Sequence, residues 1–231
     1  LSIGISESIR NMGEVPVKGV RLVSLSSTLA TNSVVEGKGC RVALIIAGED
    51  YRESVPVEHV IQIQGGHSIR GMPNCDVDVA AAKEFVASIA DQVDAIAIST
   101  FFSVRNPEHE NALKEMIVSN WDLPVVCGHE LSTQLGFHER TLTAVLNAKL
   151  IPIKAELIHS VRKVLTDFHI AAPLMIVKGD GSLMGEKLAK ERPVETILSG
   201  PAASLIGARN LTGEDEAVVV DVAERPPTSG Y

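Results

Sequence analysis

One stretch, residues 173–222, constrains the fold more than any other part of the chain. It begins with a short apolar run, residues 173–177 (PLMIV), and continues into residues 178–181 (KGDG), which predicts a buried strand followed by a tight turn. Residues 217–222 (AVVVDV) predict a second buried strand, with Asp221 near its end.

A helix is expected between these two strands. Residues 199–204 (SGPAAS) predict its start, with Ser199 or Gly200 as the cap and Pro201 at the first helical position, where a missing N–H costs nothing. Two strands that end in glycine or acid, with a helix of small residues between them, form a place where phosphate or a small polar ligand binds.

Strand patterns and helix patterns alternate along the rest of the chain. With 45% apolar and only 3% aromatic residues, the core must consist of Val, Ile, Leu and Ala, which suits α/β layers. The alternation predicts an α/β fold with a mainly parallel sheet and flanking helices. The expected strands are residues 19–25, 41–47, 59–64 (an edge strand), 94–99 and 123–127, and the expected helices are residues 1–12, 29–36, 78–90, one from 107 and a long one from about 139.

Charge and cysteine content exclude several classes of protein. The formal net charge of −8 argues against nucleic acid or an anionic membrane as the main partner. The sequence has no apolar run near the ~20 residues of a membrane span and no signal-peptide pattern. Cys40, Cys75 and Cys127 lie far apart without a CxxC pair, which indicates reduced thiols in a cytoplasmic protein rather than a zinc cluster.

Residues 26–32 (SSTLATN) place a group of hydroxyls at a strand-to-helix junction. Such a junction offers hydroxyls and free N–H groups to an anion or a polar substrate. Ordinary helix capping explains the same residues, because Ser, Thr and Asn are favoured caps for local reasons. Both interpretations stay open.

Two histidines follow expected strands. Gly65 and Gly66 would let the backbone approach a ligand beside His67. His67 is then a base or a metal ligand, or it is solvated, as most loop histidines are. His129 and Glu130 follow the strand at 123–127, where functional groups of α/β sheets gather, and they can supply a base or a ligand pair. A structural role for both stays open.

Two charged segments have simpler explanations. Residues 106–110 (NPEHE) contain two carboxylates and a histidine, but the chemistry of a helix start, with Asn106 as the cap, accounts for most of them. In residues 178–181 a turn explains the glycines and Asp180, but it does not explain why Lys178 stands beside them.

Taken in order, five segments resemble the hydantoinase A / 5-oxoprolinase family, and the resemblance covers nearly the whole chain. It implies an actin-like ATPase (ribonuclease H-like) fold, here incomplete. It also implies an N-terminal hydantoinase/oxoprolinase module at residues 1–138, lacking its first strands, and the start of the hydantoinase A module at residues 139–231. The five segments are residues 27–32 (STLATN), 106–110 (NPEHE), 139–148 (ERTLTAVLNA), 192–203 (RPVETILSGPAA) and 218–221 (VVVD).

The resemblance further implies an ATP-dependent hydrolase that opens a cyclic amide of the hydantoin or 5-oxoproline type. Phosphorylation of the amide oxygen makes that oxygen a leaving group, which requires ATP with Mg²⁺ beside a water-activating base. The expected catalytic residues are His129, Glu130, Lys178 and Asp180. The expected cofactor-binding residues are Ser27, Thr28, Thr31, Asn32, Gly179, Gly181, Gly200 and Asp221, and Asp221 is also the expected metal ligand.

The two phosphate loops of the family are missing or altered in this chain. Relatives begin with a strand and a glycine-rich loop of the Asp-x-Gly-Gly-Thr type, and this sequence starts after that point. Asp221 is followed by Val-Ala-Glu-Arg instead of glycines and hydroxyls. We therefore expect either a fragment or a chain that lacks residues after Val222.

Two other functions stay open. A non-catalytic assembly subunit would suit the altered loop after Asp221, because relatives often work with a hydantoinase B-type subunit. A β-type subunit of an ATP-dependent ketone carboxylase would also use ATP but would act on a ketone with bicarbonate. In each case we expect a cytoplasmic protein that forms oligomers, and for the enzymes a small-molecule substrate.

Overall fold

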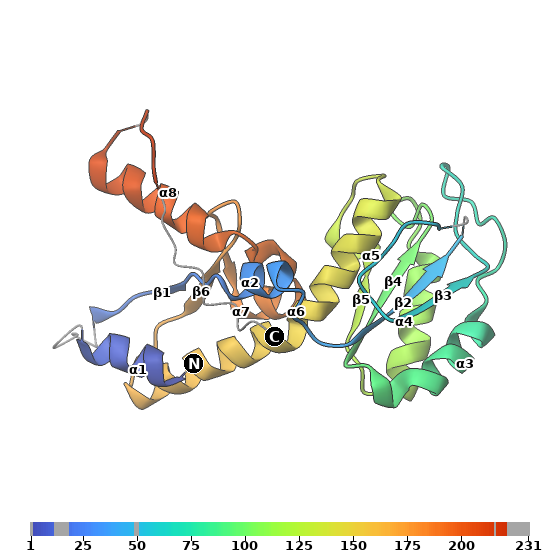
Figure 1. Cartoon of the computed structure of the whole chain (residues 1–231), viewed down its shortest axis with the longest axis horizontal. Helices are drawn as coiled ribbons and strands as arrows, with labels where there is room; N and C mark the ends of the chain where they lie inside the picture. Colours follow the sequence, from blue (N-terminus) through green and yellow to red (C-terminus); the bar gives the residue numbers. More distant parts are fainter. Residues whose placement is uncertain (1, 12–18, 49–50, 215, 221–231) are drawn as a thin grey trace, which may run out of the picture.

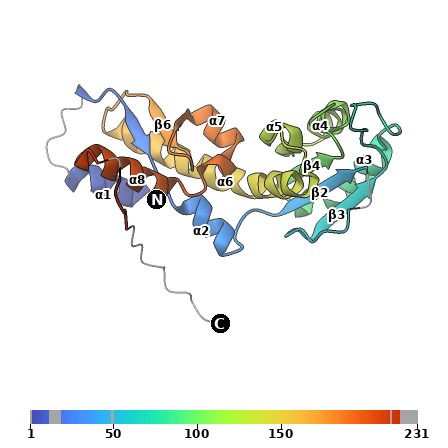
Figure 2. The same ribbon diagram turned by 90° about the horizontal axis from the view of Figure 1, so that it is seen from above.

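The computed structural model describes residues 2–11, 19–48, 51–214 and 216–220. These residues form two lobes, each built around one β-sheet, and the 31-residue helix α6, Phe137–Asp167, belongs to both (Figure 1). Figure 2 shows α6 extending from one lobe into the other. No helix in the described part of the chain is long and apolar enough to cross a membrane.

The four-stranded lobe contains a fully parallel sheet in the order β3-β2-β4-β5. Every residue of β2 and β4 is buried, because helices cover both faces: α3 and α4 pack on one face and α6 on the other. The strands are β2 (Val42–Ala47), β3 (His59–Ile63), β4 (Ala95–Thr100) and β5 (Val125–Cys127), and the helices are α3 (Val79–Ile89), η2 (Ala90–Gln92), α4 (Glu108–Asn120) and α5 (Gly128–Leu131).

The three-stranded lobe combines the beginning and the end of the chain. Its sheet has the order β1-β6-β7, with β1 parallel to β6 and β7 antiparallel to it. Apolar residues of α1, β1 and β6 pack against the second half of α6. The strands are β1 (Val23–Leu25), β6 (Leu174–Val177) and β7 (Leu183–Gly185), and the helices are α1 (Ser2–Asn11), α2 (Leu29–Val35), α7 (Glu186–Glu191), η3 (Pro193–Thr196) and α8 (Ser199–Thr212).

Helix α6 contains a proline, Pro152, at its middle. Proline lacks an N–H, so the carbonyl of Ala148 loses its helical partner. The Cys40 thiol donates to that carbonyl at 3.3 Å, and the Cys40 amide donates to the carbonyl of Lys149 at 3.2 Å. Burial raises the pKa of Cys40 to about 11, so the thiol keeps the proton that it donates. The chain before β2 therefore supports α6 where proline weakens it.

The α/β class and the mainly parallel sheet are confirmed, and so are the main strands and helices. The predicted cap of α8 is wrong. Leu198, with a left-handed φ of 62°, precedes the helix, and neither Ser199 nor Gly200 caps it. The Ser199 hydroxyl instead donates to the carbonyl of Ser27 at 3.1 Å, and Pro201 is the third helical residue rather than the first. A contact distant in sequence thus replaces the local cap.

The end of the stretch that opened the sequence analysis also differs from expectation. Residues 178–181 form the predicted tight turn, but the turn leads into an antiparallel strand, β7, which the sequence did not indicate. Residues 217–220 form no strand, and Val218 and Val220 are 93% and 77% exposed, so the predicted buried strand is wrong over these positions. Its last two residues lie outside the described part. An apolar run becomes a strand only beside another strand, and none of the described strands pairs with it.

The fold predicts a large effect of one buried amide. The Nδ2 of Asn147 in α6 donates to the carbonyl of Glu191 at 2.9 Å, and its Oδ1 accepts from the amide of Val194 at 3.0 Å. We expect Asn147→Ala to lower the free energy of unfolding by roughly 2–4 kcal/mol, because two backbone groups lose their partner. Chemical denaturation measures the loss. The matched control is Asn120→Ala, an exposed amide that bonds only to Met116, and equal losses would contradict the assignment.

Candidate functional site

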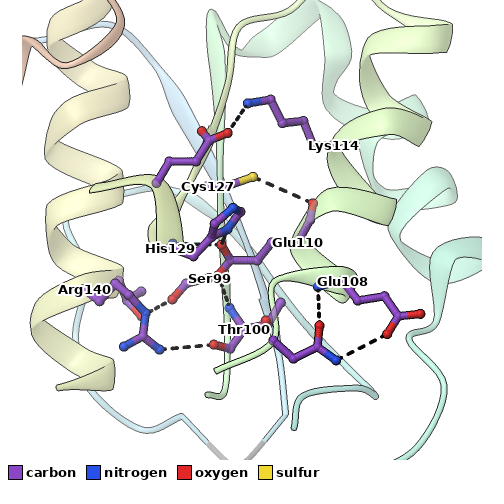
Figure 3. Close-up of polar contacts among 11 residues, drawn as sticks. Ser99, Thr100, Glu108, Glu110, Lys114, Cys127, His129 and Arg140 are labelled. Atoms are coloured by element: carbon purple, nitrogen blue, oxygen red, sulfur yellow. Dashed lines mark hydrogen bonds and ion pairs between the residues drawn. The ribbon is translucent and has the colours of Figure 1, made fainter. Parts of the chain in front are cut away.

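A fully buried carboxylate, Glu110, lies at the carboxyl ends of β4 and β5 (Figure 3). Its Oε1 accepts from the amide of Thr100 at 2.8 Å. Its Oε2 accepts from the amide of His129 at 2.9 Å and lies 2.5 Å from the Nδ1 of the same histidine. Hydrogen bonds from backbone and ring N–H groups compensate the charge that burial would otherwise penalise.

Local sequence explains how Glu110 and His129 meet. The Asn106 side chain accepts from the amide of Glu108 at 3.0 Å, as expected for a helix start, and this begins α4 so that Glu110 lies in its first turn. His129 follows Gly128, where a Cβ would lie 3.1 Å from the Cγ of Arg140 and 3.5 Å from a Glu110 carboxylate oxygen. A side chain at this position would crowd Arg140, so a glycine suits the close approach of these groups to the backbone.

Arg140 is the second buried charge of the site, with 1% of its surface exposed. Its guanidinium donates to the carbonyls of Thr100 at 3.2 Å, Gln134 at 3.1 Å and Gly136 at 3.3 Å. Burial lowers the pKa of Arg140, and the nearby Glu110 charge opposes that shift. Arg140 thus connects the end of β4 to the loop that precedes α6.

Three side chains of this site offer atoms of the kind that bind metals. The ligand atoms of Glu110, Cys127 and His129 lie within 4.8 Å of one another. However, burial raises the pKa of Cys127, so its thiol stays protonated and donates to the Glu110 carbonyl at 3.7 Å. The carboxylate is already bonded to backbone amides. Hydrogen bonds within the protein therefore already engage all three groups.

Glu130, the neighbour of His129, has a different environment. Its carboxylate pairs with Lys114 at 2.7 Å, and both side chains are about one-third exposed, at 38% and 34%. Glu130 lines a cavity of about 530 Å³ that Arg192 of the other lobe also lines. His129 and Glu130, which sequence analysis paired, therefore lie in different surroundings.

Lys178 and Asp180, the other two expected catalytic residues, lie in the β6–β7 turn of the three-stranded lobe. Lys178 pairs with Glu195 at 3.0 Å and with Asp180 at 3.4 Å. Asp180 accepts from the hydroxyl and the amide of Ser182, which lower its pKa to about 2. The ion pair with Glu195 explains why a lysine stands at position 178, which the sequence alone did not explain. The structure does not bring this pair to His129, which belongs to the other lobe.

The expected cofactor-binding residues before α8 and after β1 do come together. The Ser26 hydroxyl donates to the carbonyl of Ser199, and the Thr31 hydroxyl accepts from the amide of Leu198 at 2.9 Å. A Cβ on Gly200 would lie 3.2 Å from the Cγ2 of Thr28. Residues about 170 positions apart in the sequence thus form one cluster.

The groups of this cluster largely satisfy one another. The Ser27 hydroxyl accepts from the amide of Leu29 at 3.1 Å, which supports the capping interpretation of the hydroxyl group. The added Cβ on Gly179 would lie 2.2 Å from the carbonyl oxygen of Ile197, and on Gly181 2.3 Å from Ile206, so the protein itself occupies the space beside both glycines.

The described residues alone therefore do not form a triphosphate site. Asn32 is exposed beside the cluster, and Asp221, the expected metal ligand, lies outside the described residues. Because the hydroxyls and amides near Thr28 are mostly engaged, we derive no chemical step through ATP from them.

His67 is buried rather than solvated, so that expectation is wrong. Its ring stacks on His109 with centroids 4.1 Å apart, and the Nδ1 of His109 accepts from the amide of Gly66 at 3.0 Å. Neither ring nitrogen of His67 has a partner among the described residues. Burial lowers the pKa of both histidines, so both are neutral at pH 7.

Sequence analysis missed Glu110 and Arg140 as the centre of the site. Glu110 was counted only among residues of a helix start, and Arg140 only as part of a family segment. The available signal was Gly128 directly after a buried strand, because a glycine there indicates close approach of other groups. It did not say which groups approach.

The buried histidines predict acid sensitivity. Because the folded pKa values of His67 and His109 lie below the ordinary 6.5, the unfolded chain binds more protons, and stability falls as the pH drops through about 6.5. Each histidine contributes at most about 1.4 kcal/mol per pH unit. Denaturation between about pH 7.5 and 5.5 should show a shallower slope for His67→Gln than for wild type. An unchanged slope would contradict this, and exposed His159→Gln is the control.

The buried carboxylate predicts a stability effect. We expect Glu110→Ala to reduce the free energy of unfolding by roughly 3–5 kcal/mol, because it leaves buried amides and Arg140 uncompensated. Glu115→Ala, on an exposed position of the same helix, should change it by less than about 0.5 kcal/mol. Urea titration of both variants measures the difference, and similar values for the two would refute the central role of Glu110.

Comparison with known proteins gives relatives in sequence and in structure. The chain is 28% identical to caprolactamase subunit alpha of Pseudomonas jessenii over 95% of its length, and 23% identical to the acetophenone carboxylase gamma subunit of Aromatoleum aromaticum over 96%. It spans 36% of the length of each, about a third.

Solved structures show the same fold. The ATP-dependent caprolactamase from Pseudomonas jessenii matches with a TM-score of 0.75 at 26% identity, over 92% of this chain and 35% of that one. Nucleotide-free acetone carboxylase matches with a TM-score of 0.76 at 18% identity, over 90% of this chain and 34% of that one. The actin-like ATPase fold expected from the sequence is thereby confirmed.

Two family descriptions match consecutive parts of the sequence. "Hydantoinase/oxoprolinase N-terminal region" matches residues 1–120, and "Hydantoinase/oxoprolinase" matches residues 140–223. One sheet combines β1 of the first module with β6 and β7 of the second, so the sheets do not mark the module boundary. Its place between residues 138 and 139 stays a prediction. The two matches together cover most of the chain, which therefore belongs to the hydantoinase/oxoprolinase family.

Proposed function

We propose that this chain contributes to an ATP-dependent enzyme that opens a cyclic amide by hydrolysis. Its family membership and its similarity to a caprolactamase subunit over 95% of its length support this proposal. The observation that carries it is the pairing of His129 with the buried carboxylate of Glu110 at the carboxyl ends of β4 and β5. This is where functional groups of parallel sheets gather.

The pairing gives His129 the properties of a general base. The carboxylate beside Nδ1 favours the tautomer that carries its proton there, which leaves Nε2 free to accept one. The His129 side chain is 18% exposed, so solvent or a substrate reaches it, while Glu110 is fully buried. Glu110 is a positioning residue, because it orients the ring and stabilises the imidazolium that forms.

In the proposed reaction His129 takes a proton from water, and the water oxygen attacks the carbonyl carbon of the cyclic amide. The C–N bond then breaks, and the proton returns from His129 to the leaving nitrogen, which gives a carboxylate and an amine. ATP, when bound, would supply a phosphoryl group to the amide oxygen, and that group would leave as inorganic phosphate when a second water displaces it, so each ring opening would consume one ATP and two waters.

The partner and the remaining site residues complete the proposal. Both relatives are named as subunits, which supports assembly with a partner subunit, and we propose one of the hydantoinase B type. Asp221 is proposed to hold Mg²⁺ with ATP. Lys178 and Asp180 are proposed to stabilise the three-stranded lobe rather than to act on the substrate, because Lys178 pairs with Glu195 of that lobe and Asp180 is bonded to Ser182 within the turn.

A second candidate is a subunit of an ATP-dependent ketone carboxylase. The similarity to the acetophenone carboxylase gamma subunit and the fold shared with acetone carboxylase favour it. In that reaction the same base, His129, would remove a proton from the carbon beside the ketone. Bicarbonate dependence separates the two candidates, since hydrolysis does not consume bicarbonate.

We predict that His129→Gln lowers ATP-dependent ring opening by roughly 10²- to 10⁴-fold, as expected when a general base is lost. The assay uses the full-length protein with its partner subunit and follows ring opening of a panel of lactams and hydantoins by mass spectrometry. Glu110→Gln should lower the rate as well, because an amide in place of the carboxylate no longer holds the His129 ring with its proton on Nδ1.

The control and the opposing outcomes are defined by the same assay. Exposed His159→Gln should leave the rate unchanged. Full activity of His129→Gln would show that His129 is not the general base. Turnover of ketones only with bicarbonate would support the carboxylase, and assembly with the partner without any turnover would support a non-catalytic subunit.

A further inference from the structure

The cavity of about 530 Å³ lies between the two lobes and is lined by both of them. This volume lies within the range typical of small-molecule sites, roughly 300–1,000 Å³. One wall consists of β5, the middle of α4 and the end of α5, and the facing wall is the end of α7, with α6 between them. The cavity lining includes Lys114, Glu130, Leu131, Ile151, Lys190 and Arg192.

The α7 wall carries two cations, Lys190 and Arg192, and one carboxylate, Glu191, whose contact with Lys187 is 4.0 Å long, so the wall keeps a net positive charge. Lys190 is exposed and pairs with no carboxylate in the part of the chain that the structure describes. Arg192 has Glu195 at 3.6 Å, longer than the 2.7 Å pair on the opposite wall. A guanidinium and an ammonium on neighbouring positions suit a carboxylate, because each donates charge-assisted hydrogen bonds.

The opposite wall carries a carboxylate on an apolar surface. Glu130 pairs with Lys114 but keeps 38% of its side chain exposed, so one of its oxygens remains accessible to a cationic group. Val125, Leu131 and Ile151, all half-buried, line the cavity with these charges. Apolar surface of this kind suits a hydrocarbon chain between two charged ends.

We propose that this cavity binds an amino carboxylate whose two charged ends are separated by an apolar chain. Its carboxylate meets Lys190 and Arg192, and its ammonium meets Glu130. This inference deepens the proposed function and rests on it, because hydrolysis of a cyclic amide yields a carboxylate and an amine on one chain. A neutral lactam has neither charge, so the cavity is selective for the opened ring.

The test is calorimetric titration of the full-length protein, without ATP, with ε-aminocaproate as the probe and with caproate and hexylamine as single-charge analogues. Lys190→Gln and Arg192→Gln should each weaken ε-aminocaproate and caproate about tenfold, the size of one lost charge-assisted hydrogen bond. Glu130→Gln should weaken ε-aminocaproate and hexylamine but not caproate.

Lys187→Gln is the matched control, because Lys187 lies on the same helix, is 92% exposed and does not line the cavity, and its 4.0 Å pair with the lining residue Glu191 is a surface contact of little strength. Its affinities should equal those of wild type. Because Lys190 is itself exposed, its substitution leaves the fold intact, which a thermal unfolding curve confirms.

Three outcomes would overturn the cavity assignment: no binding of ε-aminocaproate, equal weakening by the Lys187 and Lys190 variants, or an unselective effect of Glu130→Gln on all probes. The proposed function fails separately. Selective binding without any lactam hydrolysis would refute the activity and leave the ligand class standing. Lactam hydrolysis with binding unaffected by Lys190→Gln would refute only the cavity.

Discussion

Burying the Glu110 charge sets the arrangement of the four-stranded lobe around it. An ionised carboxylate in the interior costs several kcal/mol unless hydrogen bonds replace its water. Here the amides of Thr100 and His129 supply those bonds, so the end of β4, the first turn of α4 and the start of α5 must keep their relative positions. Arg140 adds a compensating charge and extends the same constraint to α6.

The three-stranded lobe depends on contacts of a different kind. Its two family segments, residues 27–32 and 192–203, are joined by hydroxyl and backbone hydrogen bonds such as that from Ser199 to Ser27. These groups are neutral, so burying them leaves no charge to compensate. One lobe therefore holds a charged centre, and the other holds two hydroxyl-rich segments joined by neutral hydrogen bonds.

The elements that sequence analysis predicted correctly are those determined by local pattern. The apolar run of β2 and the Asn106 start of α4 need no knowledge of distant residues. The errors occur where a distant partner decides the outcome. Ser199 bonds to Ser27 instead of capping α8, and residues 217–220 lack a neighbouring strand. Glu110 gave no signal of its own, because an acid in a first helical turn has an ordinary local explanation.

Helix α6 has a mechanical consequence because Pro152 lies halfway along it. Each half is about 22 Å long at a rise of 1.5 Å per residue, so a change of about 5° at the proline would displace the far end by about 2 Å. The first half carries Arg140, and the second half packs against β6. Bending at Pro152 would thus widen or narrow the space between the lobes. Cys40, which donates to the carbonyl of Ala148, would limit the size of that bend.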